Sequence, residues 1–338
     1  RGHMLLSVLD YAMVDSGRTS QEALRETVAL AQLADELGYH RFWVAEHHQV
    51  PALASASPEL MIMHLLGKTQ RIMIGSGGIM LPHYQPYKVA EWVTTLRSLY
   101  PGRVNVGLGN NPGTSAVREL MGTAELKRSD YAQQVTDLVE YLADPESVGL
   151  HEAGPSQEAL WLLSAGLHSA QLAGSLGQAY VYGYFLAPGK DPLASAQEAL
   201  NTYRAACQEA GHKPQASLAV FVVLGQDETQ CQQLLSALDI WQLGKQDYAE
   251  FKTFPTVQEA AAYPLSQEDR AQIEINRQRV VVGTLDQVKQ QLDDLAASLD
   301  LEELMVIPLV PDIKNRQATL QVLAQAYQLN QDKKSEEL

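Results

Sequence analysis

Short apolar runs alternate with amphipathic stretches along most of this chain. Runs rich in Leu, Val and Ile predict buried strands, and apolar residues spaced by three and four predict helices. The helix predicted over 20–38 begins at a Thr19/Ser20 cap and ends at Gly38. The predicted strands cover residues 5–9, 41–45, 71–75, 104–108, 160–163, 179–184, 217–224 and 304–308. The other predicted helices cover 58–67, 86–100, 168–176, 191–211, a stretch from 227, and 315–329.

The order of these elements predicts a closed parallel sheet. Strands that alternate with helices over short connections run parallel, with the helices as crossovers. Eight such pairs predict an α/β fold, the (β/α)8 TIM barrel, as a single domain over residues 1–330. Residues 244–279 do not fit the alternation, and we expect an insertion between strands seven and eight that covers the barrel mouth. The charged residues 331–338 are expected to form a frayed tail.

Composition narrows the class of protein. The chain has 338 residues, 46% of them hydrophobic, and a formal net charge of −15. That charge disfavours nucleic acid as a partner. Without an apolar run of eighteen residues or a charged-then-apolar leader, we expect no membrane span and a cytoplasmic location. Residues 1–3 before Met4 are expected to be a cloning remnant, and Cys207 and Cys231 to be reduced, non-catalytic thiols.

Polar residues follow the second strand. Glu46, His47 and His48 lie where a parallel barrel places its chemistry, at the carboxyl end of a strand. A histidine there can act as general acid or base near neutral pH. Because neighbouring strand residues point to opposite sides, only one of the two histidines is expected to face a cavity. Alternatively, both hydrogen-bond loop carbonyls. Glu46, His47, His64 and His83 show no paired i, i+4 ligand spacing on a helix, so no metal is expected.

Small residues follow two other strands. The run Gly75–Gly78 leaves the backbone bare, which suits a flat ligand or an unusual peptide geometry, although an ordinary tight turn is the alternative. The loop Ser164–Ser169 opens a helix whose free N–H groups and dipole suit a phosphate, with a plain N-cap as the alternative. Tyr180, Tyr182 and Tyr184 either present hydroxyls on one face of the sixth strand or pack the barrel.

Several blocks of this sequence, in order, resemble the bacterial luciferase-like, flavin-dependent monooxygenases, in particular their single-chain oxidoreductase subgroup. The matching blocks are Leu5–Asp10, Gly38–His48, Ile74–Pro82, Pro86–Glu91, Leu99–Arg103, Trp161–Leu163 and Ser169–Ala173. The resemblance implies a TIM barrel, a homodimer and the use of reduced FMN with dioxygen on a small organic substrate. Because the chain has no nicotinamide fingerprint, a separate flavin reductase is expected to supply the reduced FMN.

The resemblance also assigns residues. His47 matches the family's active-site histidine, which helps form and protect the peroxyflavin, and Glu46 would buttress it. Gly77-Gly78 matches a place where the family often has a non-proline cis peptide beside the isoalloxazine ring. The residues expected to bind the cofactor are Gly77, Gly78, Asn110, Ser164, Ala165, Gly166, His168 and Ser169. Leu9 and Tyr184 are expected in the substrate pocket.

Three departures from the family pattern lie on the flavin and substrate side. Asn110 stands where relatives carry the arginine that pairs with the flavin phosphate. Loss of a charged hydrogen bond is worth roughly 1.5–3 kcal/mol, on the order of ten- to a hundredfold in affinity. Residues 164–166 replace Gly-Ser-Ser, and Tyr184 replaces a histidine.

These departures leave more than one function open. In a working monooxygenase, His168, Arg118 or Lys190 could supply the missing positive charge. Alternatively, the chain is a non-catalytic or weakly flavin-binding subunit that has lost the phosphate clamp. A deazaflavin-dependent oxidoreductase is a third possibility, less favoured by the matching blocks.

Overall fold

The computed structural model describes residues 3–151 and 158–330, so the expected tail over 331–338 lies outside the described residues. The strands are β1 (Leu5–Asp10), β2 (Arg41–Val44), β3 (Met73–Ser76), β4 (Ile79–Met80), β5 (Val104–Asn105), β6 (Gly107–Gly109), β7 (Trp161–Ser164), β8 (Ala179–Gly183), β9 (Ala216–Leu224), β10 (Val280–Gly283) and β11 (Glu303–Ile307). The α-helices are α1 (Ser20–Leu37), α2 (Pro58–Leu66), α3 (Pro86–Leu99), α4 (Ser115–Leu120), α5 (Asp130–Ala143), α6 (Leu167–Ser175), α7 (Pro192–Ala210), α8 (Glu228–Trp241), α9 (Val257–Ala262), α10 (Gln267–Arg277), α11 (Leu285–Leu299) and α12 (Ile313–Ala326). Four 3₁₀ turns are η1 (Leu81–His83), η2 (Pro145–Val148), η3 (Tyr184–Leu186) and η4 (Lys245–Tyr248).

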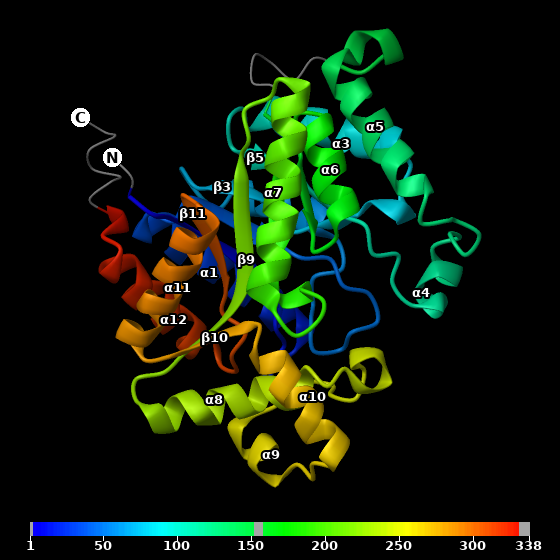
Figure 1. Ribbon diagram of the computed structural model, residues 1–338. Coiled ribbons are helices and arrows are strands. Elements are labelled where there is room, and N and C mark those ends of the chain that lie inside the picture. Colours follow the sequence, from blue (N-terminus) through cyan, green and yellow to red (C-terminus); the bar gives the residue numbers. More distant parts are fainter. Residues whose placement is uncertain (1–2, 152–157, 331–338) are drawn as a thin grey trace.

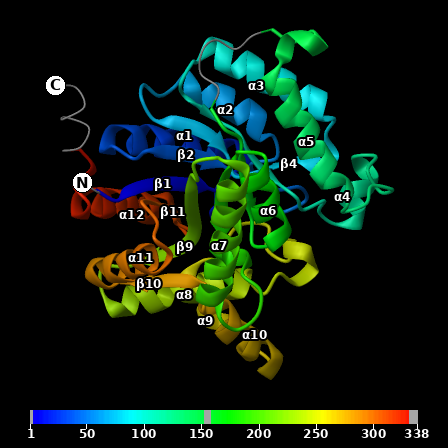
Figure 2. The ribbon, with the colours of Figure 1, turned by 45° about the horizontal axis from the view of Figure 1, so that its top comes forward.

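The sheet curls until its two ends meet. Its path runs β4-β6-β7-β8-β9-β11-β1-β2-β3-β5, and its named strand pairs are parallel. Only Gly77 and Gly78 separate β3 from β4, and only Val106 separates β5 from β6. Each of these pairs therefore forms one interrupted strand of the barrel. We call each of the barrel's strand positions a stave, and the described sheet has the eight staves of the predicted TIM-like barrel. Figures 1 and 2 show the helices wrapped around this sheet.

Two elements between the seventh and eighth staves were not predicted. Strand β10 pairs with the second half of β9, where Val280 lies opposite Phe221 and β8 has already ended. Helix α11 then supplies the crossover to β11. Its buried residues Val288, Leu292 and Ala296 recur every four positions, which is a plain helical signal. Helices α4 and α5, between the fourth and fifth staves, were not predicted either.

The hydrophobic core has two layers, as a barrel requires. Alternate residues of β1 divide between them: Leu6 and Val8 pack outward beneath the helices, whereas Leu9 points into the barrel. Inside the barrel, the rings of Trp43 and Trp161 meet edge to face with centroids 5.4 Å apart. Side chains therefore fill the interior of the barrel, and a ligand can bind only at one of its ends.

The amino-terminal end of the barrel is closed by a buried polar network. Arg41, which is 5% exposed, donates from Nε to the Glu303 carboxylate at 3.0 Å and from Nη1 to Asn105 Oδ1 at 2.9 Å. The Ser7 hydroxyl donates to the same carboxylate at 2.9 Å. The guanidinium also lies 4.7 Å from the Trp161 ring centroid. The buried polar side chains at this end therefore find their hydrogen-bond partners within the chain.

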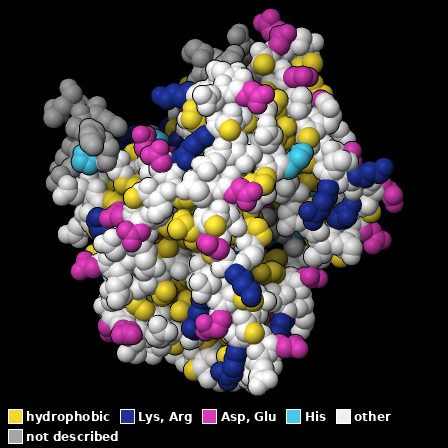
Figure 3. Space-filling model, viewed as in Figure 1, with side chains coloured by type: hydrophobic (Ala, Val, Ile, Leu, Met, Phe, Trp, Pro, Cys, Tyr) yellow, Lys and Arg dark blue, Asp and Glu magenta, His cyan; other side chains and the backbone are white. Residues whose placement is uncertain are grey.

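The segment predicted as an insertion lies between α8 and β10. It contains η4, α9 and α10, which Figure 1 shows grouped beside α8. Lys245 anchors its start, with Nζ 3.1 Å from Asp269 Oδ2 and 5.2 Å from the ring centroid of Tyr263. Acidic and basic side chains are interspersed over the face drawn in Figure 3. Among the described helices, none is both long and apolar enough to cross a bilayer.

Candidate active site

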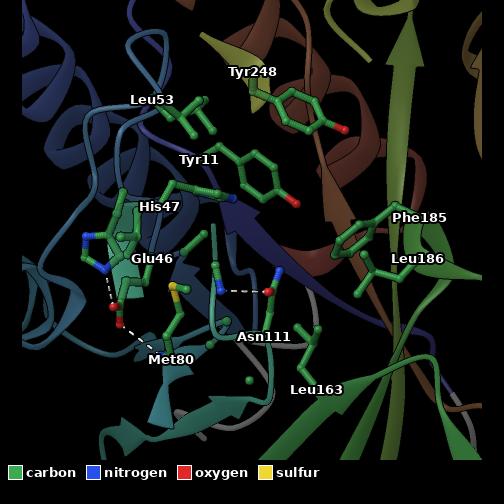
Figure 4. Close-up of a pocket in the computed structure, with 18 of the residues that line it drawn as sticks. Tyr11, Glu46, His47, Leu53, Met80, Asn111, Leu163, Phe185, Leu186 and Tyr248 are labelled. Carbon is green, nitrogen blue, oxygen red and sulfur yellow. Dashed lines mark hydrogen bonds and ion pairs between the residues drawn. The ribbon is translucent and has the colours of Figure 1, made fainter. Parts of the chain in front are cut away.

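A cavity of about 560 Å³ opens at the carboxyl ends of the strands. One side is formed by the segment after β2, the glycines between β3 and β4, and the loop Gly109–Thr114. The other side is aromatic, with Tyr11, Phe221 and Tyr248 among its lining residues. Figure 4 shows Tyr248 and Leu163 on opposite sides of the view, with His47 and Tyr11 between them. The volume lies within the range of ordinary ligand pockets, roughly 300–1,000 Å³.

His47 lies on the cavity wall, where the sequence predicts an active-site histidine. Its backbone N–H donates to the Ser55 carbonyl at 2.9 Å, and its ring packs against Tyr11 with centroids 4.8 Å apart. Its Nδ1 is buried without a hydrogen-bond partner among the described residues. Burial, with a smaller contribution from neighbouring His48, lowers the pKa of His47 to about 4. The imidazole is therefore neutral near pH 7 and able to accept or donate one proton.

Glu46 does not buttress His47, contrary to what the resemblance implied. Its Oε1 accepts the Met80 N–H at 3.0 Å, and its Oε2 accepts the Tyr84 hydroxyl at 2.7 Å. The same Oε2 lies 2.5 Å from Nε2 of His48. The carboxylate thus fixes His48 and the end of β4, and so helps to hold the cavity wall in shape.

The expectation that only one histidine faces the cavity is wrong, because both His47 and His48 line it. Strand β2 ends at Val44, so the alternation of a strand no longer applies to them. A third histidine, His83, meets the His48 ring edge to face at 6.1 Å. His83 does not line the cavity; its Nδ1 pairs with Thr123 Oγ1 at 2.9 Å, and burial lowers its pKa.

The Gly77–Gly78 peptide bond is cis and lines the cavity, as the resemblance implied. Packing requires glycine at residue 78, where a Cβ would meet backbone, and leaves little room for a Cβ at residue 77. A Cβ on Gly77 would lie 2.8 Å from Leu9 Cδ1, and one on Gly78 would lie 2.8 Å from the Leu108 carbonyl carbon. Leu9 therefore supports the glycines from behind and is not among the cavity-lining residues, which corrects its assignment to the substrate pocket.

The predicted phosphate end is only partly assembled. Asn110 lines the cavity, and its Nδ2 lies 3.5 Å from the Ser169 hydroxyl in the first turn of α6. Helix α6 has Gly166 at its N-cap and no side-chain cap, so its first N–H groups remain available to an anion. Ser164 differs from the prediction: its hydroxyl is buried between Tyr180 Oη at 3.1 Å and the Gly166 carbonyl at 3.3 Å.

No positive charge replaces the missing arginine at the cavity. None of the described residues that line it is lysine or arginine. Nη2 of Arg118 donates to the carbonyls of Ala124 and Leu126, at 3.0 and 2.7 Å. Lys190 and His168 are exposed and lie off the cavity wall, as do Ala165 and Gly166. The phosphate end therefore offers neutral donors only.

Tyr184 does not line the cavity either, which corrects the second substrate-pocket assignment. It is buried in the outer core at the start of η3, and the next two residues, Phe185 and Leu186, face the cavity instead. The residues of the aromatic side were not predicted from the sequence. Trp241 and Tyr248, whose ring centroids lie 4.8 Å apart, come from the end of α8 and from η4. Two aromatic residues flanking the start of the insertion were the available signal.

Comparisons with known proteins agree with this fold. The model of the luciferase-like monooxygenase family matches residues 4–301. The uncharacterised protein YceB of Bacillus subtilis is 35% identical over 95% of this chain and 99% of its own length. The N-acetyl-S-alkylcysteine monooxygenase of Bacillus subtilis is 28% identical over 95% of this chain and 97% of its own. The crystal structure of apo-MsnO8 has a TM-score of 0.83 and 32% identity, covering 97% of this chain and 99% of that one.

The chain thus belongs to the luciferase-like monooxygenase family. Two more distant solved structures of the same fold, 17% and 15% identical to this chain, are an oxygenating constituent of 3,6-diketocamphane monooxygenase in complex with FMN and an F420-dependent secondary alcohol dehydrogenase.

Proposed function

We propose that this chain is a monooxygenase that uses reduced FMN and dioxygen to oxidise a small organic substrate. The observation that carries the proposal is the neutral His47 imidazole, with an unpartnered Nδ1, on the wall of a 560 Å³ cavity at the carboxyl ends of the barrel strands. The imidazole lines the cavity, so the ring can reach a bound ligand, and its buried Nδ1 is not held by any described residue.

The described residues fit a flavin. The bare backbone at Gly77 and Gly78 offers a flat face for a ring. Asn110, Ser169 and the first N–H groups of α6 would hold the phosphate through neutral hydrogen bonds and the helix dipole. When bound, reduced flavin supplies the two electrons with which dioxygen yields one oxygen atom for the substrate and one for water.

The protein's own residues carry the rest of the chemistry. A neutral His47 holds or transfers one proton at the ring atom that faces the cavity, the role of a general acid or base. Tyr11 packs on this ring, and burial keeps the pKa of its hydroxyl well above neutrality, so it remains a hydrogen-bond donor. Glu46 and His48 keep the wall in place. Closely packed aromatic rings on the other side exclude water from the reacting atoms.

A second candidate function is a binding protein that has lost tight flavin binding. The specific observation in its favour is the absence of lysine and arginine among the described lining residues. The unpartnered His47 favours the enzyme, since a site kept only for passive binding has no need of a neutral, ionisable wall residue.

The biological setting is part of the same proposal. A separate flavin reductase supplies the reduced FMN transiently, the chain acts in the cytoplasm, and it forms a homodimer. FMN is preferred to F420 because the matching sequence blocks are those of FMN relatives.

The experiment is a turnover assay with a flavin reductase and isotopically labelled dioxygen. Incorporation of the label into organic product is expected for the wild type, with a loss of roughly 10²-fold or more in His47→Gln, because general acid–base groups contribute about that much. His64→Gln, at an exposed position of α2 away from the cavity, is the matched control and should keep full turnover. Label incorporation that is equal in both variants would refute the role of His47.

A further inference from the structure

The aromatic side of the cavity has a chemical character of its own. Phe185 and Phe221 stack with centroids 4.9 Å apart and planes 17° from parallel, and Tyr11 meets both rings edge-on. Trp241 and Tyr248 complete this wall, which we call the aromatic wall. Stacked and edge-to-face rings of this kind favour a partner that is itself flat and apolar.

The charge at this wall is negative or absent. Apart from Glu46, which is fully engaged, the only acid among the described lining residues is Asp247, in η4. Asp247 is exposed, and no hydrogen bond or ion pair with another described residue engages its carboxylate. An anion entering here would meet a like charge and find no cation, and an unpaired charge in an apolar site is costly.

The position of Asp247 is fixed by its surroundings. Gln246, Asp247 and Tyr248 all have positive φ, between 53° and 66°. The Tyr248 ring rests on Trp241, and Lys245 ties the start of the loop to α10 through Asp269. The backbone that carries Asp247 is thus held beside the cavity by anchored neighbours on both sides.

We infer that the aromatic wall selects a substrate that has a flat apolar body and carries no negative charge, and that Asp247 repels anions at the entrance. The inference rests on the proposed function for the statement that the ligand of this wall is the substrate. It does not concern the FMN phosphate, which would lie at the opposite, α6 side of the cavity. This cavity therefore differs from a site that binds a carboxylate or sulfonate substrate through lysine or arginine.

The test uses two probes of the same shape, 2-naphthalenemethanol (uncharged) and 2-naphthoate (anionic), titrated calorimetrically into the flavin-free protein. We expect the alcohol to bind at least tenfold more tightly. Asp247→Asn should reduce the difference in affinity between the two probes, which we call the gap. Asparagine suits the positive φ of this residue. Gln242→Lys, which places a cation on the wall, should narrow the gap further.

Matched controls place the same charge changes elsewhere. Glu36→Gln on α1 and Gln325→Lys on α12 alter exposed positions off the cavity and should leave the gap unchanged. Phe185→Leu, which removes a ring at similar volume, should weaken the alcohol severalfold. Equal or tighter binding of the naphthoate, no binding of either probe, or an unaltered affinity in Phe185→Leu would overturn the inference.

The outcome is separable from that of the proposed function because the probes are titrated without flavin. If reduced FMN fails to bind but the preference for the uncharged probe holds, the proposed enzyme falls and the ligand class stands. If reduced FMN binds and the preference is reversed, the inference alone falls.

Discussion

The two ends of the barrel treat buried polar groups in opposite ways. At the amino end, Arg41, Glu303 and Asn105 satisfy one another, and the arginine also lies over Trp161. At the carboxyl end, His47 lines the cavity and its Nδ1 has no partner among the described residues. A satisfied network fixes the structure, whereas an imidazole on a cavity wall that no described side chain engages can act on a ligand. The contrast separates the end that holds the barrel together from the end that performs the chemistry.

The contrast is tested most strongly by Arg41→Met. This change leaves the Glu303 carboxylate buried without its partner, which costs about 3–5 kcal/mol. Urea unfolding should show a loss of that order, with flavin affinity of the folded variant unchanged. Adding Glu303→Gln should recover part of the loss. A loss below about 1 kcal/mol would mean that the amino end is not the stabilising end.

Asn110→Arg tests the carboxyl end of the barrel through an expected gain in FMN affinity. A charged donor near the α6 N-terminus should tighten FMN by roughly ten- to a hundredfold, the value of a charge-assisted hydrogen bond. Riboflavin, which lacks the phosphate, is the control ligand and should bind as to the wild type. Equal tightening of both flavins would show that the phosphate does not lie beside residue 110.

The smallest expected effect is on acid stability. The folded-state pKa of His47 is about 4, against 6.5 for the free side chain, so the native protein binds fewer protons than the unfolded chain between these values. The stability contributed by the neutral histidine is complete above pH 6.5 and is lost as the pH falls towards 4. At pH 5.5 the wild type should have lost about 1.4 kcal/mol more than His47→Gln, following one pKa unit. Unfolding curves for both proteins at pH 8 and 5.5 measure this, and parallel losses would contradict the burial of the imidazole.

Much of the barrel could be predicted from the sequence because its staves are apolar runs that end at glycines and polar clusters. The same local signal placed His47 and Gly77-Gly78 on the cavity wall. The crossover helix α11 was missed although Val288 and Leu292 follow a helical period, because the preceding insertion interrupted the alternation of elements.

The side-chain partners could not be predicted in the same way. Glu46 and His47 are adjacent in the chain, yet the carboxylate bonds Met80 and Tyr84, which lie far away in the sequence, and its neighbour His48. Leu9 and Tyr184 lie on predicted strands, but which face of a stave borders the cavity depends on how the barrel closes. The aromatic wall joins Tyr11, Phe221 and Tyr248 from three distant segments, and no local pattern links them.

The most direct measurement of the central claim is an anaerobic titration of the wild-type protein with reduced FMN, followed by quenching of tryptophan fluorescence. If the unsatisfied carboxyl end is a flavin site with neutral phosphate donors, binding should saturate in the micromolar range. Absence of saturation at tens of micromolar would contradict the account and leave the cavity as the site of some other ligand.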